Sequence, residues 1–249
     1  MQKEVGLVQI RKTDPNALHL VPKSRIAYYA AKRIIDIVVS LFLLILLTPL
    51  LLLTAISIYL YSPGPILFIQ ERVGAKRQQH GKYSYWKRAN FHCYKFRTMK
   101  INADPSIHKA YIKALIENDQ NQMAAIQGEM TEARKLLHDS RITRPGKILR
   151  KSSIDELPQL WNVLTGDMSL VGPRPAIPYE VELYKPWHLQ RLAAQPGITG
   201  LQQVTARCIT DFDQQVRFDV EYINNQSLWL DIKIILKTPL AVISTTGAH

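Results

Sequence analysis

The longest apolar segment of the chain does most to limit what it can fold into. The 249-residue sequence contains no charged residue from Ile37 to Ile69. This segment begins too far into the chain and is too long for a secretory signal peptide, and it lacks a small-residue cleavage site. A charge-free apolar run of this length indicates a segment embedded in a membrane. We therefore expect a membrane protein.

Two arrangements in the bilayer are open to this segment. As one straight helix, residues 34–61 would extend about 42 Å at ~1.5 Å per residue, enough to cross a hydrocarbon core of about 30 Å. Pro49 lies near the middle, however, and each half alone is too short to span. Basic residues flank the segment on both sides, whereas a single span carries most positive charge on one side. These residues are Lys23, Arg25, Lys32 and Arg33 before it, and Arg72, Lys76, Arg77, Lys82, Lys87 and Arg88 after it.

Positive charge at both ends favours a re-entrant helix that enters and leaves by the cytoplasmic face. The bend is then expected at Thr48-Pro49, because proline cannot continue the helical hydrogen bonds. The Thr48 hydroxyl could bond a freed backbone carbonyl at this point. After the segment, the sequence Ser62-Pro63-Gly64-Pro65 is predicted to end the helix.

The overall charge indicates an anionic partner. The formal net charge is +12 and the isoelectric point is near 9.7, which suits nucleic acid, an acidic membrane surface or a phosphorylated substrate. Between Glu71 and Ala110, ten Lys and Arg residues accompany two acids. This is either an ordinary solvated face or, directly after a membrane segment, a surface for anionic phospholipid headgroups. Nucleic acid is not expected as a partner, because the sequence has no recognition-helix or base-stacking motif.

Several other classes of site are disfavoured by the sequence. The two cysteines, Cys93 and Cys208, have no CxxC spacing, so reduced thiols are expected instead of a disulfide framework or a zinc site. The seven histidines show no paired spacing for a metal. A phosphate-loop glycine motif and a dinucleotide-binding fingerprint are both absent from the sequence.

The pattern along the chain predicts an α+β fold that is mostly helical. Its three parts are expected to be a polar N-terminal tail (1–24), a re-entrant membrane helix (25–62) and a cytosolic catalytic domain (63–249). Short strands are predicted at 66–69 and 94–97, and helices at 106–138, 184–191 and 212–224, with a turn at 196–200 between the last two.

Two adjacent acids, Asp155 and Glu156, precede a short amphipathic helix whose apolar residues recur at helical spacing over 157–164. Ser153 and Glu156 fit a capping box, which would give Glu156 a purely structural role. That register puts Pro158 beyond the first turn, where its ring disrupts a helix. A helix start at Asp155 keeps Pro158 inside the first turn. Asp155 is then either simply an N-cap or a carboxylate at an end that favours anions.

A helix cap requires only one acid, so the presence of Glu156 beside Asp155 favours a catalytic role for the pair. An ionised Asp155 at a helix N-terminus could act as a nucleophile towards phosphorus. Glu156, together with Asp155, could hold Mg²⁺, which usually takes one or two protein carboxylates plus substrate phosphates.

Basic residues near by in the predicted fold complete the candidate site. Arg174 lies between Pro173 and Pro175, so its backbone is stiff, and it could pair with an acid such as Asp167 or bind a phosphate with both guanidinium arms. Lys95 and Arg97 alternate with aromatic residues on a predicted strand. This alternation is either ordinary inside-outside patterning or two cations aimed at one anion. Together these groups indicate a diphosphate site.

These residues belong to a series of motifs that resembles a known family. In order they are Lys32-Arg33-Ile34-Ile35-Asp36, Ser62-Pro63-Gly64-Pro65, Gln70-x-Arg72-x-Gly74, Lys95-Phe96-Arg97-Thr98-Met99, Asp155-Glu156-Leu157-Pro158-Gln159-Leu160, Gly172-Pro173-Arg174-Pro175, Pro196-Gly197-Ile198-Thr199-Gly200 and Trp229-Leu230-Asp231-Ile232-Lys233. The chain resembles the bacterial sugar transferases, or monotopic phosphoglycosyl transferases, over residues 32–240.

The resemblance implies an activity and a division of roles. It implies transfer of a phosphosugar from a UDP-sugar to polyprenol (undecaprenyl) phosphate, with release of UMP, as the first membrane step of bacterial glycoconjugate assembly. Asp155 would form a covalent phosphoglycosyl-enzyme, Glu156 would be associated with Mg²⁺, and Arg174 would bind phosphate. Arg72, Lys95, Arg97, Pro173 and Pro175 are predicted to belong to the same phosphate-binding set. The membrane helix would be re-entrant, with the catalytic domain on the cytoplasmic face of the inner membrane.

The sequence departs from the family at three places. The helix break is Thr48-Pro49 where the family often has Ser-Pro, Gln202 stands where many members carry tryptophan, and the 106–138 stretch has no inherited role. The competing hypothesis is a non-enzymatic membrane-anchored scaffold or regulator that uses the basic surface for lipid or a partner. The sequence fixes neither the sugar nor the oligomeric state, and a homo-oligomer is compatible with it.

Overall fold

The apolar segment forms two helices, α2 (Ile26–Leu46) and α3 (Thr48–Tyr61), which meet at an angle of 61°. A 3₁₀ turn, η1 (Lys23–Arg25), precedes them. The break lies at the predicted Thr48-Pro49 position, and the Thr48 hydroxyl donates a hydrogen bond of 2.7 Å to the Leu44 carbonyl. The structure is a computed structural model that describes residues 14–81, 83–127, 139, 141–205 and 211–243.

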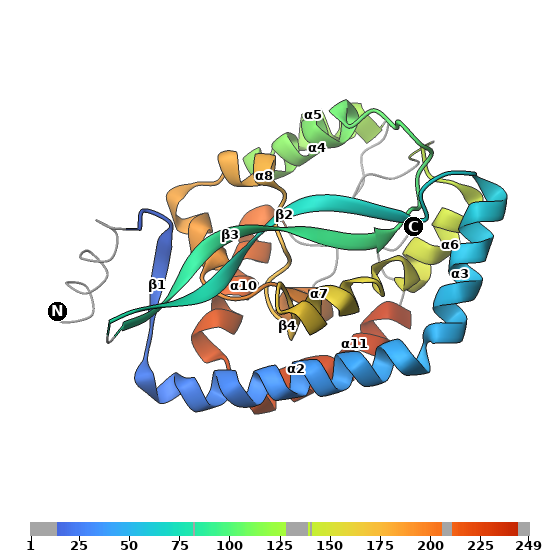
Figure 1. Ribbon diagram of the computed structural model, residues 1–249. Helices are drawn as coiled ribbons and strands as arrows, with labels where there is room; N and C mark the ends of the chain where they lie inside the picture. The colour runs from blue at the N-terminus through green and yellow to red at the C-terminus, as the bar shows by residue number, and fades with distance from the viewer. Residues whose placement is uncertain (1–13, 82, 128–138, 140, 206–210, 244–249) are drawn as a thin grey trace.

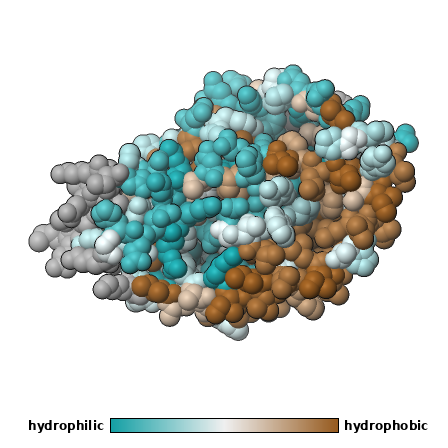
Figure 2. Space-filling view, in the orientation of Figure 1, coloured by the Kyte–Doolittle hydropathy of each residue, from teal (hydrophilic) through white to brown (hydrophobic). Residues whose placement is uncertain are grey.

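The outward surface of this bent pair is apolar. Exposed side chains include Phe42 and Ile45 on α2 and Leu53 and Leu60 on α3. Figure 2 shows the resulting hydrophobic surface along the lower and right-hand edges of the molecule, where Figure 1 places α2 and α3. Among the described helices, none alone is long and apolar enough to cross a membrane, whereas α2 and α3 together meet that requirement as a bent pair.

A long antiparallel hairpin runs through the middle of the molecule (Figure 1). Its strands are β2 (Leu67–His80) and β3 (Tyr83–Phe96), paired from Leu67 opposite Phe96 to His80 opposite Tyr83. The two short strands predicted at 66–69 and 94–97 are only the far end of this hairpin. Its polar remainder forms strand because each backbone finds its ladder partner in the other arm, which hydrophobic patterning does not reveal.

The predicted polar tail is wrong for its described part. Residues 17–21 form β1 (Ala17–Val21), which pairs antiparallel with β3 and completes a three-stranded sheet of order β1-β3-β2. Ala17 and Val21 are buried, packed with Tyr85 and Trp86 respectively. The strand forms because it covers these aromatic residues and pairs an otherwise open strand edge. Residues 1–13 of the predicted tail lie outside the described residues.

The predicted helix at 106–138 is interrupted. Its described part consists of α4 (Ser106–Glu117) and α5 (Gln120–Gln127), and residues 128–138 lie outside the described part of the chain. Asn118 ends α4 in the left-handed conformation with φ 58°. The Asp119 carboxylate then accepts from the Gln122 backbone N–H at 3.0 Å, as an N-cap does.

The remaining elements alternate helices with two short strands. In order they are α6 (Arg144–Ser152), η2 (Ile154–Glu156), α7 (Gln159–Thr165), β4 (Ser169–Val171), α8 (Pro178–Glu182), η3 (Pro186–Leu192), β5 (Gly197–Thr199), α9 (Leu201–Thr205), α10 (Phe212–Asn225) and α11 (Leu228–Ile243). The helix predicted at 212–224 is therefore confirmed. The segment predicted as a helix at 184–191 is the 3₁₀ segment η3, and the predicted turn at 196–200 contains β5, which pairs in parallel with β4.

The largest core cluster of the described residues joins α2 to elements that follow much later in the chain. It contains Cys93 of β3, Val163 of α7, Met168 and Tyr222, and one side of α2 packs against it. This side of α2 also carries a buried polar row at i, i+4 and i+8, formed by Lys32, Asp36 and Ser40. The described structure is thus mostly helical with a small sheet, as predicted, and the apolar helix α2 is packed onto the rest of the described chain.

Candidate active site

The two acids lie in a 3₁₀ turn and not at the start of the amphipathic helix. The turn η2 comprises Ile154–Glu156, and α7 begins at Gln159 with Pro158 as its N-cap. The predicted helix start at Asp155 is therefore wrong. Pro158 has no N–H to donate to the Ile154 carbonyl, which instead accepts from the Leu157 N–H at 3.1 Å in a tighter turn.

Asp155 is buried within this turn, with 9% of its surface exposed. Burial, followed by the neighbouring Glu156 carboxylate, raises the pKa of its carboxyl to about 6, while Lys95 and Arg150 limit the rise. The carboxyl is therefore ionised at neutral pH but is protonated in mild acid.

The side chain of Glu156 is paired with a cation from the sheet. The Lys95 ammonium on β3 donates a hydrogen bond of 2.8 Å to Glu156 Oε1, and both side chains are mostly buried. Ser153 adopts the left-handed conformation with φ 57° and makes no side-chain cap to this turn. The capping-box interpretation of Ser153 and Glu156 is thus excluded, and Glu156 faces the sheet.

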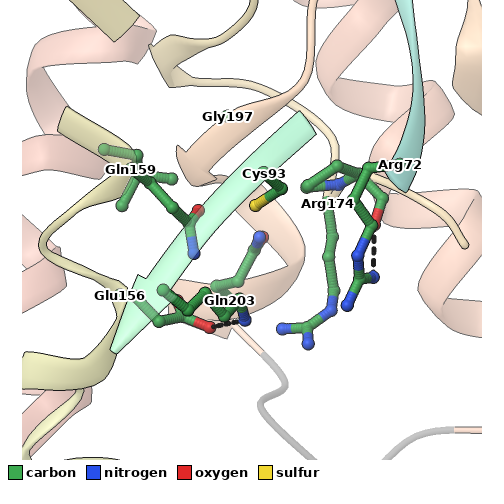
Figure 3. A pocket seen from close by; sticks show the side chains of 10 residues that line it. Arg72, Cys93, Glu156, Gln159, Arg174, Gly197 and Gln203 are labelled. Carbon is green, nitrogen blue, oxygen red and sulfur yellow. Dashed lines mark hydrogen bonds and ion pairs between the residues drawn. The ribbon is translucent and has the colours of Figure 1, made fainter. Parts of the chain in front are cut away.

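A second element brings Arg174 towards these acids. The Gly172-Pro173-Arg174-Pro175 loop follows β4, and Arg174 itself is exposed. Arg72, from β2, supports the loop by donating a hydrogen bond of 3.0 Å to the Pro175 carbonyl. Figure 3 shows the Arg72 and Arg174 side chains beside one another at the pocket.

These groups line one small polar pocket. Its enclosed space is about 10 Å³, roughly the size of one water molecule or one phosphate oxygen. The lining residues are Arg72, Cys93, Lys95, Glu156, Gln159, Arg174, Pro175, Gly197, Ile198 and Gln203. Arg72 and Arg174 indicate that the pocket binds an anion. Two guanidinium groups held close together repel each other, and a negative group between them relieves that repulsion.

Close backbone packing fixes the floor of this pocket. A Cβ added to Gly172 would lie 2.3 Å from the Gln195 carbonyl oxygen, and one added to Gly197 would lie 2.1 Å from the Gly172 nitrogen. Only glycine allows the two chains to approach this closely. The Gly197 N–H also donates to the Pro173 carbonyl at 2.9 Å, so Pro173 supports the floor and does not line the pocket itself.

The structure brings together most, but not all, of the residues predicted for the site. Glu156, Lys95, Arg72, Arg174 and Pro175 share the pocket, whereas Asp155, the neighbour of Glu156 in the η2 turn, does not line it. Arg97 lies elsewhere, directly after β3. It donates to the Ser62 carbonyl at the end of α3, and an added Cβ on Gly64 would lie 2.7 Å from its Nη1. Arg97 thus fixes the turn that leaves the apolar segment.

The donor set available for a metal is limited. Among the described residues, no cluster of three or more His, Cys, Asp or Glu side chains is suited to a metal ion. The two neighbouring carboxylates of Asp155 and Glu156 fit a cation that also uses oxygens of a bound phosphate, as Mg²⁺ does.

The sequence of this chain matches one known protein family over most of its length. The chain matches the model of the bacterial sugar transferase family over residues 27–245. It belongs to that family. The predicted resemblance is thus confirmed, and the pocket lies entirely within the matched residues.

Curated relatives of this sugar transferase come from several bacteria. It is 42% identical over 223 residues to the undecaprenyl-phosphate galactose phosphotransferase of Salmonella typhimurium, covering 88% of this chain and 41% of the relative. It is 38% identical over 237 residues to the UDP-glucose:undecaprenyl-phosphate glucose-1-phosphate transferase of Caulobacter vibrioides, covering 92% and 75%. It is 37% identical to the exopolysaccharide production protein ExoY of Sinorhizobium fredii, covering 88% of both. The chain spans about two fifths of the length of the Salmonella relative.

Sequence reasoning missed three polar groups at the pocket of this sugar transferase. Gln159 and Cys93 line it from α7 and β3, and both are buried. Gln203 lines it from α9, and its buried Oε1 has no hydrogen-bond partner within the described residues. Gln159 lies within the acid-pair motif, which could have pointed to it. Cys93 and Gln203 give no such signal, because their approach depends on how β3 and α9 pack.

Proposed function

We propose that this chain is the catalytic part of an enzyme that transfers a sugar phosphate from a UDP-sugar to polyprenol phosphate, releasing UMP. The observation that carries the proposal is the pocket that Glu156, the neighbour of Asp155 in the η2 turn, shares with Arg72 and Arg174. The names of the Salmonella and Caulobacter relatives, a phosphotransferase and a glucose-1-phosphate transferase acting on undecaprenyl phosphate, support it.

In the proposed reaction, Asp155 acts as the nucleophile. Its carboxylate oxygen bonds to the phosphorus that carries the sugar, and the bond from that phosphorus to the bridging oxygen breaks, so that UMP leaves. An oxygen of polyprenol phosphate then bonds to the same phosphorus and displaces the Asp155 carboxylate. The product is a polyprenol diphosphate sugar, and the enzyme returns to its starting state.

The cationic groups of the pocket match the charge that this reaction develops. Arg174 is the exposed guanidinium and would bind the diphosphate with both arms. Arg72 holds the Pro175 carbonyl and adds a second positive charge close by. Lys95 neutralises Glu156 while the pocket is empty of substrate.

Mg²⁺ fits the acid pair as a resident cofactor. Glu156 and Asp155 would hold it, and when bound it would neutralise negative charge on the diphosphate. The raised pKa of Asp155, caused by burial and by Glu156, supports this assignment because a neighbouring cation would favour the ionised carboxyl.

The apolar pair α2 and α3 would bring the acceptor to this site. We propose that it is a re-entrant element in the cytoplasmic leaflet of the bacterial inner membrane, with the rest of the described chain on the cytoplasmic side. The 61° bend and the exposed apolar residues on both helices support this arrangement. Anionic phospholipids would be the surrounding lipids, attracted by the basic surface.

The decisive test measures nucleotide release. Purified protein with Mg²⁺, polyprenol phosphate and a panel of UDP-sugars should release UMP with at least one sugar, which also identifies the donor. Release of UDP would contradict the proposal, because it marks direct transfer of the sugar alone. Without acceptor, the protein should gain the mass of one sugar phosphate.

The variant Asp155→Asn should lose both turnover and the trapped mass. Asp167→Asn is the matched control, because Asp167 pairs with Lys76 outside the pocket and should retain activity. A non-enzymatic scaffold would release no UMP with any sugar and would tolerate Asp155→Asn without loss of function.

A further inference from the structure

The helix before the acid pair exposes one cationic face. On α6, the four exposed side chains are Arg144, Lys147, Ile148 and Lys151. Their spacing of i, i+3, i+4 and i+7 puts them on one side of the helix. Ile148 is 70% exposed in the middle of three cations. We refer to these four residues as the α6 stripe.

The direction of the α6 stripe is fixed by the opposite side of the helix. Leu149 is buried in a cluster with Ile58 of α3. A Cβ added to Gly146 would lie 2.2 Å from the Thr98 carbonyl oxygen, so the helix backbone touches the end of the hairpin. The Thr143 hydroxyl caps the helix by accepting from the Gly146 N–H at 3.1 Å. The stripe therefore has one orientation relative to α3.

The helix also lies next to the reactive turn. Ser153 ends α6 in the left-handed conformation, and η2 with Asp155 follows at once. Ile154 of that turn packs in the same cluster as Leu149 and Ile58. A displacement of α6 relative to α3 would therefore move Asp155 with it.

We propose that the α6 stripe docks on anionic phospholipid headgroups beside α3, with Ile148 inserted among them, and so fixes the height of Asp155 above the bilayer. The proposal rests on the proposed function, because it takes α3 as membrane-embedded. Two observations support the choice of occupant. The stripe adjoins a helix whose outer face is apolar and exposed at Leu53 and Leu60, and its three cations complement a negative surface.

The test uses an environment-sensitive NBD label at Ile148→Cys, in a background carrying Cys93→Ser and Cys208→Ser. Ala110→Cys on α4 is the matched site, since Ala110 is also exposed on a helix and Figure 1 places α4 on the side of the molecule away from α2. The protein is reconstituted in phosphatidylcholine vesicles with and without phosphatidylglycerol. Quenching by spin-labelled lipid and the emission wavelength report docking.

With phosphatidylglycerol, the label at residue 148 should be quenched and blue-shifted, and the label at residue 110 should not. Lys147→Glu with Lys151→Glu should lower the docking equilibrium about tenfold or more, because each basic residue near such a surface contributes substantially. Lys113→Glu with Arg217→Glu, an equal charge change on α4 and α10, should leave it unchanged.

Equal solvent exposure of the labels at residues 148 and 110 would overturn the proposal. Equal docking without phosphatidylglycerol would show that charge plays no part in it and would overturn the choice of anionic headgroups. A label at Leu53→Cys on α3 tests the embedded helix separately. If that label is also solvent-exposed, the re-entrant arrangement fails, whereas UMP release tests the chemistry independently of both.

Discussion

The Asp155 carboxyl lies in surroundings that oppose its own ionisation. Burial and the neighbouring Glu156 raise its pKa to about 6, and the cations Lys95 and Arg150 limit the rise. A nucleophilic carboxylate must be deprotonated, so the rate of transfer should increase with pH through this range. In the proposed mechanism, the balance of charges around this carboxyl therefore sets the pH below which activity falls.

The first prediction concerns Lys95. Lys95→Gln removes a positive charge that lowers the pKa of Asp155, so the acid limb of the kcat/KM profile should move to higher pH. Lys76→Gln is the control, because Lys76 also pairs with an acid but on the exposed part of the hairpin, and its limb should stay in place. An unmoved limb in Lys95→Gln would show that the titrating group is not Asp155.

The second prediction concerns the stability of Asp155→Asn. The folded-state pKa of Asp155, about 6, lies above the ordinary value of 3.8. Folding therefore favours the protonated carboxyl, so stability falls as the pH rises between these two values, and the loss is complete above pH 6. At pH 8 the variant should gain about 1–3 kcal/mol in free energy of unfolding, and near pH 4 the gain should vanish. Denaturant unfolding in detergent at both pH values measures it. A loss of about 1 kcal/mol instead would indicate a helix cap.

At the scale of elements, α2 is hydrogen-bonded to β4, the strand that leads into the loop carrying Arg174. Asp36 Oδ1 accepts from the Leu170 N–H at 2.9 Å and from the Ser169 hydroxyl at 3.1 Å. Both donors belong to β4, which ends directly before Gly172. Arg33 also donates to the carbonyls of Val163 and Leu164 near the end of α7. The apolar segment is therefore a structural support of the pocket.

The third prediction tests this support. Asp36→Ala leaves the buried Leu170 N–H without its partner, so we expect a loss of about 1–3 kcal/mol in stability and a transfer rate at least tenfold lower. Ser40→Ala is the control on the same buried face, since the Ser40 hydroxyl bonds only to carbonyls of its own helix, those of Asp36 and Ile37. Thermal unfolding and UMP release should separate the two variants. Equal effects would show that the bond to β4 is unimportant.

The elements that sequence alone predicted best are those with strong local signals. The bend at Thr48-Pro49 follows from a single proline in an apolar run, and the helix at 212–224 follows from hydrophobic periodicity. β1 was missed because its five residues gain their stability from Tyr85 and Trp86, far away in the chain. The η2 turn was mistaken for a helix start because both conformations accommodate Pro158, and packing on α6 and β3 decides between them.

The candidate site shows the same division. Asp155, Glu156 and Arg174 were identified from local motifs, and the pocket brings Glu156 and Arg174 together. Strand alternation groups Arg97 with Lys95, yet only Lys95 of the two lines the pocket, because the Arg97 guanidinium binds the Ser62 carbonyl. Gln203 gives no signal in the sequence, because its contact with the pocket depends on how α9 packs in the fold.

At the scale of the whole molecule, the exposed apolar residues gather on α2 and α3 while the pocket is polar. Figure 2 shows hydrophilic residues over the hairpin and hydrophobic ones along the α2–α3 edge. In the proposed function, the apolar surface faces lipid and the polar surface faces the water-soluble substrate. The transferase chemistry proposed for this chain requires contact with both.

The fourth prediction concerns the bend. Thr48→Leu with Pro49→Leu restores helical hydrogen bonding, so α2 and α3 should join into one membrane-crossing helix. A cysteine at Ile26, which is exposed in the first turn of α2, should then react with an impermeant maleimide from the periplasmic side of intact spheroplasts. In the unaltered segment it should not. Pro65→Ala, outside the helices, is the control. Labelling of the unaltered segment would contradict the re-entrant arrangement.

The bond between Asp36 and β4 also has a consequence for biosynthesis. Asp36 is separated from its partner Ser169 by 133 residues, which a ribosome adds in about 7–27 s. During that interval α2 and α3 have been made, but the domain that covers one side of α2 has not. Under the proposed membrane arrangement, α2 and α3 are therefore available for insertion before β4 has been made, and β4 bonds to Asp36 only afterwards.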